Sequence, residues 1–343
     1  MPDSVSLPFC VPWFAFAHIF AAPGLAMSQH PTAYNGYLNQ CTTLECNRHF
    51  LTGFSSPQIS MSRATIYSFS FLEKYCVSLR FASKFKHEII KQMLDDGFYV
   101  HFSHVDDYYL PGKSWYGVRH FNHDGMICGY DEADKTYSIA AYDNNWIFNL
   151  IRIPQDCFSK GVYSCMKNKQ YSVLTAYRAD SMLVVKLDEK MILQYLKEYL
   201  ENTFDKFPLD QLGKVEGIAV QDFIVLYLDK IKDGSIPIEK IDWRIMRPVW
   251  EHKRCMLDRI KAIEELYNWD PEFSSQYAPL VEDSNRIRMM YAMYCKTHKE
   301  SLLDKVQKGI IAFKDKEEEI LKEFVKRMEE EQSLNYGNIS KKK

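Results

Sequence analysis

The sequence predicts an α+β fold, with an antiparallel sheet and helices in its first part and a mostly α-helical region in its second. Short segments of alternating apolar residues lie between polar turns from about residue 98 to residue 187, as expected for strands. Beyond residue 188, apolar residues recur at helical spacing almost to the C-terminus. The chain has 343 residues, of which 46% are hydrophobic and 26% charged, so it can form two folded domains.

Helices are expected before the sheet. Residues 13–22 are apolar, follow Pro12 and precede Pro23, which is typical of a short buried helix. Residues 88–96 place apolar side chains on one face, and Gly97 is a suitable helix end. Both helices would then pack against the strands that follow.

The remaining elements follow in two groups. Strands are expected at residues 98–104, 122–130, 136–142, 147–153, 171–178 and 182–187. Asp188 is a favourable helix N-cap, and helices are expected to follow it, with further helices over residues 218–231, 249–267, 284–298 and 299–331. We therefore expect domains at residues 1–187 and 188–335 and a disordered tail at 336–343.

Composition excludes several classes of partner and cofactor. The 43 basic and 45 acidic side chains give a formal net charge of -2, so no overall field favours nucleic acid or a membrane surface. The nine cysteines show no CxxC or zinc-finger spacing. His101 and His104 would point to opposite faces of a strand. The sequence therefore predicts neither a metal site nor an organic cofactor.

The cysteine pattern also bears on location. Scattered cysteines in odd number are typical of reduced thiols in a cytoplasm. The apolar segment at residues 11–27 resembles a signal peptide only superficially, because it lacks a basic start and contains His18. We therefore expect a cytoplasmic protein.

His123 and Asp143 are the most informative pair in the chain. They lie ten residues on either side of Ala133, within two expected strands joined by a polar turn. In an antiparallel hairpin centred on Ala133 they would face each other, with Cβ atoms roughly 5 Å apart. A carboxylate at that distance can orient an imidazole, which then exchanges protons with a nucleophile. A structural hydrogen-bonded pair is the alternative interpretation.

Two motifs carry a resemblance to known proteins. Residues 123–131 (HDGMICGYD) are similar to the histidine strand of papain-like peptidases that process bacteriocin precursors. Together with residues 105–111 (VDDYYLP), they more closely resemble the N-terminal domain of butirosin-biosynthesis protein H. The resemblance covers about residues 1–180, and the helical half is loosely similar to helical extensions of that family.

The resemblance implies a papain-like fold and a thiol-dependent activity. The family includes an acyltransferase that moves an aminoacyl group from an acyl-carrier-protein thioester to an aminoglycoside amine, and relatives occur in natural-product clusters, including those for nonribosomal peptides. It implies a nucleophilic cysteine, with His123 as base and Asp143 orienting it. Asp106 and Tyr108 are implied as substrate contacts, because their loop borders the cleft in the family.

The nucleophile departs from the family pattern. Papain-like enzymes carry it at the start of the first core helix, but residues 13–22 contain no cysteine. Cys10 lies just upstream and is the first candidate, and Cys46 is the second. A structural thiol is the alternative for each.

Three functions therefore remain open. The first is an acyltransferase that uses a carrier-protein thioester and a small-molecule or peptide amine. The second is a catalytically inactive papain-like binding or scaffold protein of a biosynthetic cluster, which the missing helix-start cysteine favours. The third is a cysteine peptidase, since the same histidine and carboxylate would serve peptide hydrolysis.

Overall fold

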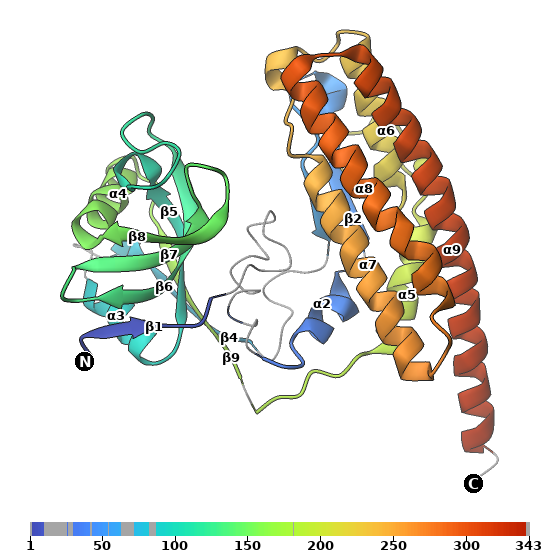
Figure 1. Ribbon diagram of the computed structural model, residues 1–343, viewed down its shortest axis with the longest axis horizontal. Helices are drawn as coiled ribbons and strands as arrows, with labels where there is room; N and C mark the ends of the chain where they lie inside the picture. The colour runs from blue at the N-terminus through green and yellow to red at the C-terminus, as the bar shows by residue number, and fades with distance from the viewer. Residues whose placement is uncertain are drawn as a thin grey trace. The chain divides into compact units, whose positions relative to one another are not determined.

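The computed structural model describes the chain except for Met1, residues 10–25 and 27–29, Thr42, Phe54, residues 63–71 and 82–86, Ser181 and residues 341–343. Within the described residues the fold is α+β with antiparallel sheets, and the C-terminal region is helical, as predicted (Figure 1). The chain divides into two units. The first contains residues 1–34 and 65–185, and the second contains residues 35–64 and 186–343.

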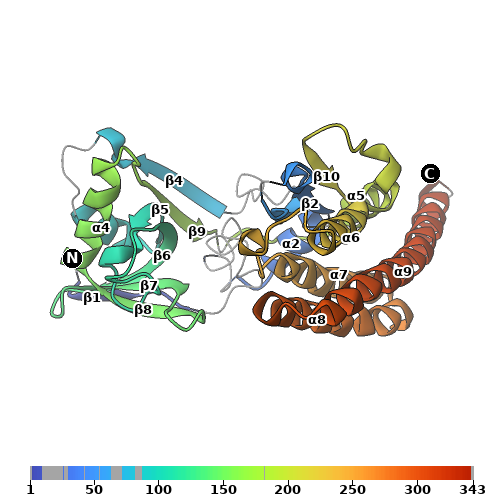
Figure 2. The ribbon, with the colours of Figure 1, turned by 90° about the horizontal axis from the view of Figure 1, so that it is seen from above.

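An antiparallel sheet forms the centre of the first unit. Its strand order is β4 (Leu72–Ser78), β9 (Val173–Ala179), β5 (Tyr99–Asp106), β6 (Asn122–Asp131), β7 (Thr136–Tyr142) and β8 (Phe148–Pro154). The short strand β1 (Ser4–Ser6) pairs with the C-terminal half of β6. In Figure 2, β4 and β9 run side by side at one edge of this sheet.

Two helices, α3 (His87–Asp95) and α4 (Gln155–Lys167), complete the core of the first unit. Ile90 of α3 and Phe158 of α4 belong to one buried cluster with alternate strand residues, including Val100 and Ile127. The predicted helix at 88–96 is confirmed, and it ends before Gly97 at φ 81°, a left-handed conformation that glycine adopts at low cost.

The β6–β7 hairpin has the predicted register on the side that faces away from its turn. Met126 pairs with Ala140 and Ile127 with Ile139, both symmetric about Ala133. A register shift between Ile127 and Gly129 changes the pairing nearer the turn, as a β-bulge does. The ladder ends at Met126 and Ala140, so the two strands no longer pair where His123 and Asp143 would meet.

Long helices dominate the second unit. These are α5 (Glu189–Glu201), α6 (Ala219–Lys232), α7 (Met246–Tyr267), α8 (Glu272–Thr297) and α9 (Glu300–Ser340), with the short α2 (Tyr34–Gln40) at its start. Helices α7, α8 and α9 pack side by side (Figure 1). A small sheet in the order β10 (Lys214–Glu216), β2 (Thr43–Asn47) and β3 (Ile59–Ser62) lies in the same unit.

Short 3₁₀ segments connect several of these elements. They are η1 (His49–Thr52), η3 (Leu79–Phe81), η4 (Asp107–Tyr109), η5 (Phe204–Lys206) and η6 (Ile238–Lys240). Only η4 contributes to the site described below.

Several expectations about the elements are corrected. The described residues of 182–187 form no strand, and Asp188 caps α5 by accepting from Met191 N at 2.9 Å. Helix α8 begins at Glu272, earlier than expected, and contains Pro279. Helix α4 and strands β1 to β4 and β10 were not expected, and residues 35–64 join the second unit.

Two further expectations concern the ends of the chain. Helix α9 continues to Ser340, into the segment expected to be a disordered tail. The expected helix at 13–22 lies outside the described residues. Among the helices that are described, none combines the length and apolar character needed to cross a membrane.

Candidate functional site

His123 lies at the start of β6 within a cluster of charged side chains. Its Nδ1 is hydrogen-bonded to Lys113 Nζ at 3.2 Å and lies 3.3 Å from Asp107 Oδ2. Its Nε2 lies 3.8 Å from Asp124 Oδ1, and the second oxygen of that carboxylate lies 3.3 Å from His101 Nε2. The His123 side chain is 21% exposed, so the ring is held by its neighbours yet remains accessible.

The end of β5 brings these groups together. Val105 pairs with His123 across the strands, and η4 begins two residues later at Asp107. The loop after η4 returns Lys113, whose Nζ lies 3.6 Å from Asp107 Oδ2. Both side chains are 4% exposed, and such buried charges are tolerated when they are paired.

The pKa of Lys113 is lowered by burial, while the neighbouring carboxylates of Asp107 and Asp124 oppose that change. A buried ammonium beside a histidine is an arrangement that the sequence did not lead us to expect. It places a positive charge beside Nδ1 of His123, next to the Asp107 carboxylate.

The expected pairing of His123 with Asp143 is corrected by this geometry. Asp143 follows β7, and its carboxylate accepts from Asn145 N at 2.8 Å, Ile147 N at 2.9 Å and Asn149 Nδ2 at 2.9 Å. These bonds hold the turn between β7 and β8. Among the described carboxylates, those within ion-pair distance of His123 belong to Asp107 and Asp124.

Asp106 is also corrected as a substrate contact. Its residue is 1% exposed, and its carboxylate accepts from Ser164 Oγ at 2.7 Å, His120 Nδ1 at 2.7 Å, Phe121 N at 3.1 Å and Tyr108 N at 3.2 Å. Four internal donors leave no acceptor position for a substrate amine. Burial raises the pKa of Asp106, but the hydrogen bonds outweigh it and the net pKa is lowered.

Tyr108 lies beside this carboxylate rather than beside His123. Its ring stacks on that of His120, with centroids 4.4 Å apart. The side chain of His120 is 63% exposed, so Tyr108 and His120 form a partly open aromatic surface. Contact between Tyr108 and a substrate stays a prediction.

The cysteines narrow the choice of nucleophile. Cys10 lies outside the described residues. Cys46 belongs to β2 in the second unit, and burial raises its pKa to about 12, which corrects its ranking as the second candidate. In the first unit burial raises the pKa of Cys128 and Cys165 to about 12 and also raises that of Cys157. Such thiols hold little reactive thiolate.

The residues that lead to Cys10 are anchored on the sheet of the first unit. Tyr99 OH donates to Pro8 O at 2.6 Å. Phe9 stacks on Phe148 of β8, with ring centroids 6.2 Å apart. The neighbour of Phe148, Asn149, holds the Asp143 carboxylate, so Phe9 packs next to the turn that follows β7.

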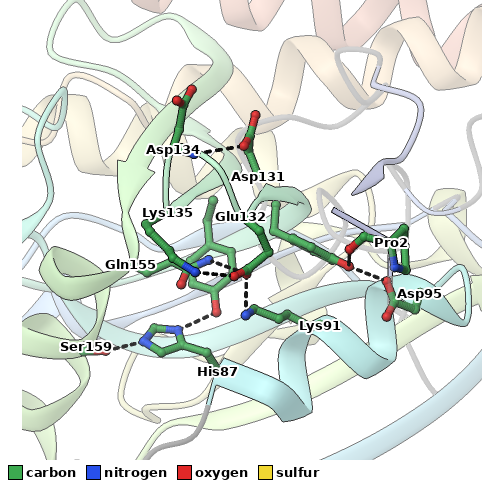
Figure 3. A network of polar contacts seen from close by, with 12 residues as sticks. Pro2, His87, Lys91, Asp95, Asp131, Glu132, Asp134, Lys135, Gln155 and Ser159 are labelled. Atoms are coloured by element: carbon green, nitrogen blue, oxygen red, sulfur yellow. Dashed lines mark hydrogen bonds and ion pairs between the residues drawn. The ribbon is translucent and has the colours of Figure 1, made fainter. Parts of the chain in front are cut away.

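A contact between a serine and a histidine lies elsewhere in the first unit, within the network of Figure 3. His87 Nε2 is 2.9 Å from Ser159 Oγ, and His87 Nδ1 is 2.6 Å from the hydroxyl of buried Tyr137. A phenol donating to Nδ1 leaves the ring proton on Nε2, so the ring donates to Ser159 and does not activate it. We interpret this contact as structural.

His87 gives a prediction for acid stability. Burial lowers its pKa, so between the folded and unfolded pKa values the unfolded state binds more protons. The associated stability is present above about pH 6.5 and is lost as pH falls through the folded pKa. The free energy of unfolding of the wild type, measured with urea, should decrease between pH 7.5 and pH 5.5, and that of His87→Gln should decrease less. An equal decrease in both proteins would contradict this assignment.

Sequence reasoning missed Asp107 and Lys113. The adjacent acids Asp106 and Asp107 offered a signal, because neighbouring residues near a strand end point to opposite sides. One of them therefore had to face the histidine side. Lys113 gave no such signal, since it lies in a loop.

Within the described part of the chain, no group of three or more His, Cys, Asp or Glu side chains is placed to hold a metal ion. Comparison with other proteins adds no assignment: the sequence matches no protein-family model and no curated protein.

Proposed function

We propose that the first unit is a papain-like, thiol-dependent acyl-transfer domain of natural-product biosynthesis. It would move an acyl group from a carrier-protein thioester to an amine, with Cys10 as nucleophile and His123 as acid and base. One observation carries the proposal: a partly exposed imidazole is held between buried or half-buried carboxylates, Asp107 and Asp124. Such an environment orients the ring for proton transfer.

The chemistry needs two transfers. The Cys10 sulfur attacks the thioester carbonyl, a new thioester forms on Cys10, and the carrier thiol leaves with the proton returned by His123. An amine then attacks the Cys10 thioester, the amide bond forms, and the amine proton passes through His123 to the departing Cys10 sulfur. No oxidant, metal or cofactor is required.

Asp107 takes the orienting role that the motif implied for Asp143. Asp107 is nearly buried and lies 3.3 Å from His123 Nδ1, whereas the carboxylate of Asp143 is engaged by its own turn. Asp143 contributes by shaping the turn beside which Phe9 packs through Phe148. This anchorage supports Cys10 over the other cysteines.

An inactive papain-like scaffold is the alternative. It is favoured by the raised pKa values of Cys128, Cys157 and Cys165, which remove these three thiols as nucleophiles for the proposed activity. A cysteine peptidase would use the same groups on a peptide bond. In each case we propose a cytoplasmic protein, with a carrier protein as partner only for acyl transfer.

Thiol labelling tests the proposal. Iodoacetamide at pH 6 should modify Cys10 faster than the exposed Cys76, because a thiolate paired with His123 reacts where an ordinary thiol is protonated. Peptide mapping by mass spectrometry identifies the site. His123→Ala should slow Cys10 to the rate of Cys76, whereas the control His120→Ala should leave it fast.

The acyl donor separates the three functions. Acyl-carrier thioesters should add the acyl mass to Cys10, and an added amine should remove it. Acylation by peptides in place of thioesters would indicate a peptidase. Uniformly slow labelling of all cysteines would reject both enzyme forms and leave the scaffold.

A further inference from the structure

Nδ1 of His123 faces two groups of opposite charge. Lys113 Nζ forms a hydrogen bond with it at 3.2 Å, and Asp107 Oδ2 lies 3.3 Å away. The two partners are themselves 3.6 Å apart. A ring nitrogen carries either one proton or one lone pair in the ring plane, so it can donate to Asp107 or accept from Lys113, but not both.

The donor character of lysine decides between these states. An ammonium group has donors only, so a hydrogen bond from charged Lys113 requires a lone pair on Nδ1. The proton of the neutral ring is then on Nε2. Lys113 is well placed to impose this state, because its residue is 6% exposed and its backbone N–H donates to Leu110 O at 3.2 Å.

We infer that Lys113 is a positioning residue that holds His123 in the Nε2–H tautomer. A ring that gains a second proton carries one on each nitrogen, and Nδ1 then donates to Asp107. Lys113 must first leave Nδ1 and remain on Asp107 alone. The inference deepens the proposed function and rests on it for its use: Lys113 would restrain thiolate formation at Cys10 until the ammonium moves.

Other titratable groups lie near the pair. By element they are His101 of β5, Asp106 and Asp107 at the end of β5 and in η4, Asp124 of β6, Asp143 after β7, and the neutral thiol of Cys165 in α4. The carboxylates of Asp107, Asp124 and Asp143 favour the charged form of Lys113. These groups lie within the same unit, so each affects Lys113 and His123 whether or not a substrate is bound.

Nitrogen-15 NMR of the full chain tests the inference without any substrate. In the wild type at neutral pH, the ring proton of His123 should be bonded to Nε2. His120 is an internal control, since its Nδ1 lies 2.7 Å from the buried Asp106 carboxylate and should carry the proton. Opposite tautomers for these two histidines in one spectrum are the expected result, and a proton on Nδ1 of His123 would overturn the inference.

A Lys113→Met variant tests the effect of the charge. Its His123 should change to the Nδ1–H tautomer, because Asp107 is then the remaining described partner within reach of Nδ1. An unchanged His120 spectrum shows that the variant is folded. An unchanged His123 tautomer in the folded variant would overturn the inference, and the wild-type tautomer decides alone if the variant does not fold.

Labelling separates this inference from the proposed function. Iodoacetamide at pH 6 should modify Cys10 faster in Lys113→Met than in the wild type, since a ring that donates from Nδ1 to Asp107 has its lone pair on Nε2, where it can accept the thiol proton. If the tautomer changes as expected while no cysteine reacts quickly, the role of Lys113 stands and the proposed function fails. If Cys10 reacts quickly but equally in both proteins, the proposed function stands and the restraint by Lys113 fails.

Discussion

Replacing Glu317 with leucine is expected to destabilise the helical unit by about 3–5 kcal/mol, the range for removing one partner of a buried ion pair. Glu317 and Lys253 are both 0% exposed, and Lys253 Nζ lies 2.7 Å from each Glu317 oxygen. Without the carboxylate, the Lys253 ammonium would stay buried without an opposite charge. Chemical denaturation of the full chain, with hydrogen exchange to separate the two units, measures the loss.

The effect should be large because five helices meet at this one carboxylate. Tyr199 of α5 donates to Glu317 at 3.0 Å, Gln221 of α6 at 2.6 Å, and Tyr277 of α8 also donates to it. Lys253 belongs to α7 and Glu317 to α9. Burying a charge is costly, but this set of donors satisfies it and fixes how the helices align.

Two comparisons make the prediction specific. The neighbouring Glu318 pairs with Lys322 at the surface, so Glu318→Leu should change stability by no more than about 0.5 kcal/mol. The double variant Lys253→Met with Glu317→Leu should recover much of the loss, because it removes both charges together. Equal stability of Glu317→Leu and Glu318→Leu would contradict the assignment.

Local patterns predicted much of the first unit. Strand β7 has the bounds expected from its alternation, and the hairpin register near Met126 and Ala140 follows from symmetry about Ala133. The register shift after Ile127 gave no sequence signal, because an extra residue in a strand does not interrupt the apolar pattern. From the sequence alone, the pairing of β6 with β7 was expected to extend to His123. In the structure it ends at Met126.

Contacts between distant segments could not be predicted in the same way. Strand β10, at Lys214–Glu216, pairs with β2, at Thr43–Asn47, and so residues 35–64 belong to the second unit. Such pairing depends on packing between remote parts of the chain, and a single sequence carries no local signal for it. Helix α8 likewise includes Pro279, a residue that removes one backbone hydrogen bond from a helix interior.

The candidate site was likewise predicted in part: its local motif was recognised, but its contacts with other segments were not. His123 was identified from its motif and lies in a charged cluster, but the carboxylate nearest its Nδ1 belongs to Asp107 and not to Asp143. The bulge in β5 between Phe102 and Val105 changes which residues face the histidine. A register shift of one residue therefore changes which side chains lie beside His123, although strands β5 to β8 lie close to where the sequence predicted them.

Asp106→Ala is the substitution expected to affect the first unit most. Asp106 is buried, and its carboxylate joins Ser164 of α4 to His120 and to the backbone N–H groups of Tyr108 and Phe121. Removing it leaves these donors without their acceptor, and each unsatisfied buried group costs about 1–3 kcal/mol. We expect a loss of at least about 3 kcal/mol in denaturation experiments, while Asp156→Ala, at the exposed start of α4, should have little effect.

The Asp106 carboxylate should also determine how the stability of the first unit decreases in acid. Its pKa is lowered in the folded state by hydrogen bonds that outweigh burial, so its stabilisation is present above about pH 3.9 and is lost as pH falls through the folded pKa. Asp106→Asn, which cannot ionise, should be less stable at pH 7 and less sensitive to acid below pH 4. Because Asp107 follows directly in the chain, Asp106→Asn should also weaken the contact between Lys113 and His123, visible as a changed His123 tautomer. A variant with wild-type stability and an unchanged His123 spectrum would show that Asp106 does not hold the site together.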